Sequence, residues 1–120
     1  MFPRGQRLDG RPTLLVRGDL DICGSISLEA ELTLVESARP PVIVLDLREL
    51  GFIDLHGLDA ILAANERARS QGRRIVCVLG VNGPVRRLFD LAGAADEIEI
   101  LDRARHGDDS DDQAPAPGAA

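Results

Sequence analysis

Two neighbouring stretches decide the fold: "VIVLDL", residues 42–47, and "FIDLHGLDAIL", residues 52–62. The first is almost continuously apolar, which predicts a β-strand buried on both faces. The second becomes helical near its end, because its apolar residues repeat at helical spacing. Between the strand and the helix lie Asp54, Leu55, His56 and Gly57. Recognition or chemistry in an open α/β sheet tends to occur at such a turn, so residues 54–57 are the first candidate site.

Further strands are predicted on both sides of these stretches. "TLLVRG", residues 13–18, and "RIVCVL", residues 74–79, are short, apolar and rich in β-branched residues. "EIEIL", residues 97–101, alternates polar and apolar residues, which predicts a half-exposed edge strand. Asp9-Gly10 is a hairpin signal, so we expect a weak first strand at residues 5–8.

Three helices are predicted between these strands. The apolar face of the first consists of Leu28, Leu32 and Val35. Ser25 or Ser27 is available as its N-cap, and Pro40 and Pro41 end it. The second carries an apolar stripe of Leu58, Ile61, Leu62 and Ala68, and it ends at Gly72. The third begins near Gly83-Pro84, with Asn82 as its candidate cap, and ends at Gly93. Its apolar face consists of Val85, Leu88 and Leu91.

The resulting order, β-β-α-β-α-β-α-β, predicts an α/β fold. Strands that alternate with helices indicate a mixed, mostly parallel sheet of four to five strands with three or more crossover helices. With 120 residues, the chain is expected to form one domain over residues 1–104. Residues 105–120 are acidic and rich in alanine and proline, a composition that buries too little apolar surface, so we expect them to be disordered.

Charge argues against nucleic acid as a partner. The formal net charge is -6, and residues 107–120 contribute four aspartates and no basic residue, which leaves -6 + 4 = -2 for the rest. A slightly acidic domain lacks the basic face that phosphate binding needs. Aromatic residues make up only 2% of the chain, so stacking platforms for single-stranded bases are also missing.

The two cysteines, Cys23 and Cys77, are too few and too far apart for a disulfide framework or a zinc site. Cys77 lies in an apolar strand and is predicted to be inert packing. Cys23 precedes a predicted helix, where a thiolate is favoured, so a redox role is a minor alternative to simple packing. No apolar run approaches the ~20 residues of a membrane span, and residues 1–12 lack a signal-peptide core, so we expect a cytoplasmic protein without membrane insertion.

Catalysis at the turn has weak support. Asp54 and His56 would point the same way on an extended segment and could form a general base, but no nucleophile or oxyanion hole accompanies them. None of the serines lies in a nucleophile-elbow context, and "LGVNGP", residues 79–84, lacks the phosphate-loop lysine and the dinucleotide spacing. An exposed histidine beside a helix-capping aspartate explains the pair better. We therefore predict no catalytic residue and no cofactor.

A metal site is a second alternative that the residues support weakly. Asp19, Asp21, Asp54 and His56 could hold a divalent ion if their two loops are neighbours. An aspartate before a helix is ordinarily an N-cap, however, so we predict no metal. What remains is a loop surface followed by a helix start, which suits recognition better than turnover.

Three segments together resemble the STAS domain, and more narrowly the bacterial anti-sigma-factor antagonists. They are "GDLD" at residues 18–21, "VIVLDLREL" leading into "GFIDLHGLDAIL" at residues 42–62, and "VRRLFDLAG" at residues 85–93. The resemblance covers about residues 5 to 102. It implies the STAS fold, which agrees with the element order. It also implies a partner, an anti-sigma factor of the serine-kinase type, which the antagonist binds so that the sigma factor is freed.

The family's phosphorylation site is where this chain departs from the pattern. In the family, the kinase phosphorylates the first serine of an Asp-Ser-Ser/Thr-Gly-Leu turn, and the added charge of about -1.5 to -2 breaks the complex. Asp54, Gly57 and Leu58 match that turn, whereas Leu55 and His56 replace its two hydroxyl residues. Because leucine cannot be phosphorylated, the usual switch is absent.

Four hypotheses follow for function. The chain is a constitutive anti-sigma-factor antagonist, or a STAS adaptor in a transporter or other regulatory complex; STAS domains also occur in anion transporters and lipid-transport complexes. The third is an enzyme or ligand sensor that uses Asp54 and His56, and the fourth a diverged paralogue whose turn is merely a helix cap. We favour the protein-binding hypotheses, the antagonist first. The predicted partner-binding residues are Asp19, Asp21, Asp54, Leu55, His56, Gly57 and Leu58.

Overall fold

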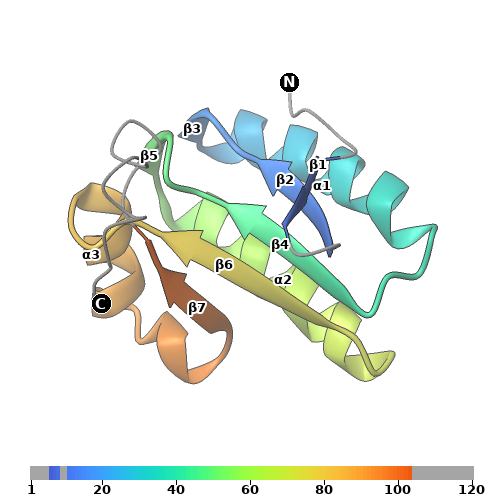
Figure 1. Ribbon diagram of the computed structural model, residues 1–120. Coiled ribbons are helices and arrows are strands. Elements are labelled where there is room, and N and C mark those ends of the chain that lie inside the picture. The colour runs from blue at the N-terminus through green and yellow to red at the C-terminus, as the bar shows by residue number, and fades with distance from the viewer. Residues whose placement is uncertain (1–5, 9–10, 104–120) are drawn as a thin grey trace.

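The computed structural model describes residues 6–8 and 11–103 of the chain. Its main sheet has five strands in the order β1-β2-β4-β6-β7 (Figure 1). β1 is antiparallel to β2, and every other neighbouring pair is parallel. The strands are β1 Gln6–Leu8, β2 Arg11–Leu15, β4 Val42–Asp46, β6 Arg74–Leu79 and β7 Glu99–Asp102. The predicted α/β class and mostly parallel sheet are confirmed. The Asp9-Gly10 turn and the predicted disordered tail, residues 105–120, lie outside the described residues.

A second, two-stranded sheet was not predicted from the sequence. It pairs β3, Gly18–Leu20, with β5, Leu50–Ile53, in parallel. Both strands are short, and three or four residues are too few to display the alternating pattern by which a strand is found in a sequence. The predicted order of elements was therefore incomplete, since a short strand precedes each of the first two helices.

The helices occupy the predicted positions. They are α1 Ile22–Glu36, α2 Leu55–Ser70 and α3 Pro84–Leu91, and a short 3₁₀ helix, Ala94–Asp96, follows the third. Figure 1 shows α1 and α2 together behind the main sheet, while α3 lies at the end where β5 is found. Gly72 and Gly93 follow α2 and α3 with positive φ angles, as the sequence predicted for residues that end a helix.

One hydrophobic core lies between the main sheet and the helices. Alternate residues of the central strands contribute to it, including Ile43 and Leu45 of β4 and Ile75 and Cys77 of β6. The helices add, among others, Leu28, Leu32, Leu58, Ile61 and Phe89. Other β4 and β6 residues, such as Val44 and Val76, are buried as well, as the continuous apolar character of these strands predicted.

Three local predictions were wrong. The N-cap of α1 is Asp21, because its side chain lies at the strand-to-helix turn, whereas Ser25 and Ser27 already lie inside the helix. The N-cap of α3 is Gly83 and Asn82 makes no cap bond there. Leu91 is 79% exposed, and Phe89 takes the buried position instead. At six residues from Val85, Leu91 lies roughly 240° around the helix, away from the apolar face.

Candidate functional site

Two strand-to-helix turns of the same construction form the candidate site. The β3–α1 turn reads Asp-Ile-Cys-Gly at residues 21–24, and the β5–α2 turn reads Asp-Leu-His-Gly at residues 54–57. In each turn the aspartate accepts a hydrogen bond from the backbone N–H of the glycine, at 2.9 Å for Asp21 and 3.0 Å for Asp54. Each aspartate therefore caps its helix and satisfies an otherwise unpaired backbone donor. We call residues 21–24 and 54–57 the paired turns.

Close backbone contacts hold the paired turns beside each other. A Cβ atom at Gly57 would lie 2.1 Å from the carbonyl oxygen of Leu20, and one at Gly24 would lie 2.3 Å from that of Asp19. Only glycine permits these approaches. The backbone N–H of Asp54 also donates to the Leu20 carbonyl at 3.3 Å. Both helices thus begin against the end of β3.

The predicted partner-binding residues divide into exposed and buried groups. Asp19, Leu55 and His56 are exposed, Asp21 and Asp54 are half-buried, and Gly57 and Leu58 are buried. Leu55, the first residue of α2, is 61% exposed although its side chain is apolar. Gly57 and Leu58 therefore position the turn from inside, and Leu55 and His56 form its outer surface.

Sequence reasoning missed three exposed apolar residues on the same elements. Ile22 is 55% exposed, Ile26 is 67% exposed and Phe52 is 48% exposed. Ile22 holds in its turn the place that Leu55 holds in the other, directly after the capping aspartate. The repeated Asp-x-x-Gly pattern was the signal that could have revealed it. We use "candidate surface" for Ile22, Ile26, Phe52 and Leu55 together with Asp19, Asp21 and Asp54.

The site holds little that would support catalysis or metal binding. His56 Nδ1 lies 3.8 Å from Asp54 Oδ2, at an exposed position. Among the residues that the structure describes, no three His, Cys, Asp or Glu side chains come together so that they could hold a metal ion. The four residues considered as metal ligands thus do not form such a cluster.

The two thiols have different environments. Cys23 is exposed in the first turn of α1, so the packing role favoured for it from the sequence was wrong. Cys77 is fully buried in β6, and burial raises the pKa of its thiol to about 12, because a thiolate there would lose its hydration. Cys77 is a packing residue, as predicted.

Comparison with known proteins assigns the chain to a family. A family profile described as "Mlab, STAS domain" matches residues 5–102, which is most of the chain. The chain belongs to the STAS domain family. The described part of this STAS domain contains no helix that is long and apolar enough to cross a membrane.

Solved structures share the STAS fold. An anti-sigma factor antagonist from Mycobacterium paratuberculosis is 23% identical, with a TM-score of 0.75 over 84% of each chain. The anti-sigma factor antagonist SpoIIAA in its unphosphorylated form is 16% identical, with a TM-score of 0.68 over 92% of this chain and 96% of that one. A sulfate transporter family protein from Wolinella succinogenes is 18% identical, with a TM-score of 0.58 over 73% of each chain. At these identities the likeness shows the fold alone.

Proposed function

We propose that this STAS domain is a cytoplasmic regulatory module that binds an anti-sigma factor of the serine-kinase type through the candidate surface and so promotes sigma-dependent transcription. The observation that carries the proposal is Leu55, an exposed leucine at the first position of α2. It is paired with an exposed isoleucine, Ile22, at the same position of α1. Isolated exposed apolar residues are ordinary, but two at matching positions of neighbouring turns suit a docking surface.

The chemistry of the candidate surface suggests what the partner presents. Burying Leu55 fully would contribute about 1.5–3 kcal/mol to binding. The carboxylates of Asp21 and Asp54 lie in the paired turns, and that of Asp19 lies in β3, just before the first turn. The partner surface is therefore expected to carry an apolar centre with basic residues around it, since complementary charge guides association and fixes the register of docking.

Binding is proposed to lack phosphorylation control at the usual place. By the chain's resemblance to the turn motif of the family's antagonists, Leu55 takes the place of the phosphorylated serine, and its side chain has no hydroxyl group. In those antagonists a phosphoryl group adds about -1.5 to -2 charges to a docking surface that already holds carboxylates. Without that step, the amount of antagonist in the cell would set how much anti-sigma factor is captured.

A second candidate function is an adaptor subunit in a transporter or another regulatory complex. The observations that favour it are the likeness to a sulfate transporter family protein and the family description that matches the chain. The same candidate surface would serve this role, because an exposed apolar turn is equally suited to a partner that is not a kinase.

Affinity capture from the native cytosol in the presence of ATP tests both candidates. The tagged full chain, a Leu55→Ser variant and a Leu55→Asp variant serve as parallel baits, and mass spectrometry identifies captured proteins and phosphate on the baits. We expect the native bait to capture an anti-sigma factor and stay unmodified, Leu55→Ser to gain phosphate, and Leu55→Asp to capture much less. Capture of transporter subunits that is lost in Leu55→Asp would support the adaptor. Equal capture by the native and Leu55→Asp baits would contradict docking at this surface.

A further inference from the structure

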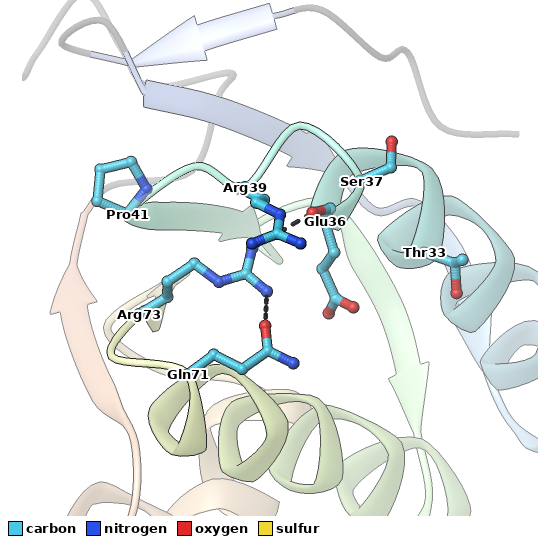
Figure 2. A pocket seen from close by; sticks show the side chains of 7 residues that line it. All are labelled: Thr33, Glu36, Ser37, Arg39, Pro41, Gln71 and Arg73. Atoms are coloured by element: carbon cyan, nitrogen blue, oxygen red, sulfur yellow. Dashed lines mark hydrogen bonds between the residues drawn. The ribbon is translucent and has the colours of Figure 1, made fainter.

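A hollow of about 710 Å³ lies at the opposite ends of α1 and α2 from the paired turns. It is bounded by the last turn of α1, the loop that leads into β4 and the residues that follow α2. Figure 2 shows the side chains of Arg39 and Arg73 reaching into this hollow from two different loops. Two guanidinium groups in one concave site are the feature that needs an explanation, since like charges repel.

Among the described residues, no carboxylate forms an ion pair with either arginine. Arg73 donates a hydrogen bond to the backbone carbonyl of Glu36 at 3.4 Å and another to the side chain of Gln71. Both acceptors are uncharged. Among the described residues, none forms a hydrogen bond or an ion pair with the Arg39 side chain. Glu36 also borders the hollow, but its carboxylate lies 3.5 Å from Arg67, on α2.

Several other arginines of this chain have their charge neutralised by a nearby carboxylate. Each of five arginines lies within ion-pair distance of a carboxylate: Arg17, Arg48, Arg67, Arg74 and Arg86. Among the described residues, further arginines without such a partner, for example Arg69, do not border the hollow; Arg39 is exposed like them, and Arg73 is half-buried. Arg39 and Arg73 are distinguished because they share one concavity and neither has an ion-pair partner in the described part of the chain.

The backbone gives an independent reason to single out Arg39. Each α-helix is followed by one residue in the left-handed region, and after α2 and α3 that residue is glycine, Gly72 and Gly93. After α1 it is Arg39, with φ of 55°, the one non-glycine residue with positive φ in the described part of the chain. An arginine is unfavourable in this conformation, where glycine or asparagine is usual. The arginine side chain is therefore held at this position at a conformational cost that a glycine would avoid.

A structural role at the end of α1 accounts more fully for Arg73 than for Arg39. A cation near a helix C-terminus interacts favourably with the helix dipole and can bind the last carbonyl groups. Arg73 already does this at the end of α1 through the Glu36 carbonyl. Arg39 adds a second charge without any such bond.

We propose that Arg39 and Arg73 form a binding site for a phosphate-type oxyanion, either free phosphate or a small phosphomonoester. Planar guanidinium groups match the oxygens of phosphate in a bidentate manner and keep their charge at any physiological pH. One bound dianion would neutralise both arginines. This site is separate from the candidate surface and does not depend on the proposed function.

Titration of the full chain with inorganic phosphate, followed by NMR of the arginine Nε–H signals at constant ionic strength, tests the site. We expect saturable shifts at Arg39 and Arg73. Arg39→Asn, which tolerates the left-handed backbone, should weaken phosphate binding on the order of tenfold or more. Arg69→Gln, the matched removal of an exposed arginine, should leave the affinity unchanged. A parallel titration with phosphoserine distinguishes an esterified ligand, which would bind at least as tightly, from the free ion.

Two results would overturn the proposal. One is a shift that grows without saturation, or that is the same in Arg39→Asn as in Arg69→Gln, because it would reflect general ionic effects. The other is a clear loss of thermal stability in Arg39→Asn without phosphate, because it would make Arg39 a structural cap. We expect that variant to be at least as stable as the native chain, since it removes backbone strain.

Discussion

Leu55 and Ile22 show what a single residue contributes to this surface. Each follows a capping aspartate, and each exposes more than half of its surface, 61% and 55% respectively. The sequence identified Leu55 because the turn pattern around it resembles a known motif. Ile22 was missed because apolar periodicity cannot tell whether a residue in the first turn of a helix faces the core or the solvent. Only the pairing of β3 with β5 reveals that both turns lie together.

Cys77 carries a residue-scale prediction about pH. Its thiol pKa is raised to about 12 in the folded protein, so the folded state retains a proton that the unfolded state releases at lower pH. The contribution of this group to stability is complete below the pKa of the unfolded thiol and is lost as pH rises toward 12. The chain contains no lysine and no tyrosine, so few other side chains titrate in this window. We expect the free energy of unfolding to fall above about pH 9.

Urea denaturation at a series of pH values between 8 and 11 measures this effect, in roughly the window where a free thiol titrates. Cys77→Val is the matched control, since it keeps an apolar side chain of similar size in β6 and removes the titrating group. A decline of equal steepness in the native protein and in Cys77→Val would show that another group is responsible.

At the scale of elements, the sequence predicted the long segments well and the short ones poorly. β4, β6 and the three helices were found because each is at least five residues long and shows either a continuous apolar run or apolar residues at helical spacing. β3 and β5 were missed because their pairing, rather than their own sequence, makes them strands. The missed pair matters most for the candidate surface, since it places the starts of α1 and α2 side by side. The cap of α2, Asp54, was predicted correctly, but that of α1 was misassigned, because a serine inside a helix and an aspartate before it are equally good candidates until the boundary is known.

Gly57 carries the element-scale prediction, because it sets how closely α2 approaches β3. A methyl group there would lie 2.1 Å from the Leu20 carbonyl oxygen, so the backbone of the turn would have to move. We expect Gly57→Ala to reduce the free energy of unfolding by about 1–3 kcal/mol. The matched control is Gly51→Ala in β5, whose methyl group would make an ordinary contact at 3.5 Å. Chemical denaturation compares the two variants, and equal stability of both would argue against the close approach.

At the scale of the whole molecule, the two candidate sites are spatially separated. The candidate surface lies at the N-terminal ends of α1 and α2, and the arginine hollow lies at their C-terminal ends. With 15 residues in α1, roughly 21 Å of helix separates them. An oxyanion and a protein partner could therefore be bound at the same time. The fold class and the position of the turn at residues 54–57 followed from the sequence, whereas the hollow did not, because it depends on where two loops distant in sequence meet.

The measurement that tests the central claim most directly is the dissociation constant of the captured partner for Leu55→Asp, set beside that for Leu34→Asp. Leu34 is a fair control, because it is 53% exposed on α1 but lies near the other end of that helix. Docking on the paired turns predicts that Leu55→Asp weakens binding on the order of ten- to a hundredfold, while Leu34→Asp stays within about twofold of the native protein. Equal dissociation constants for the two variants would contradict the account.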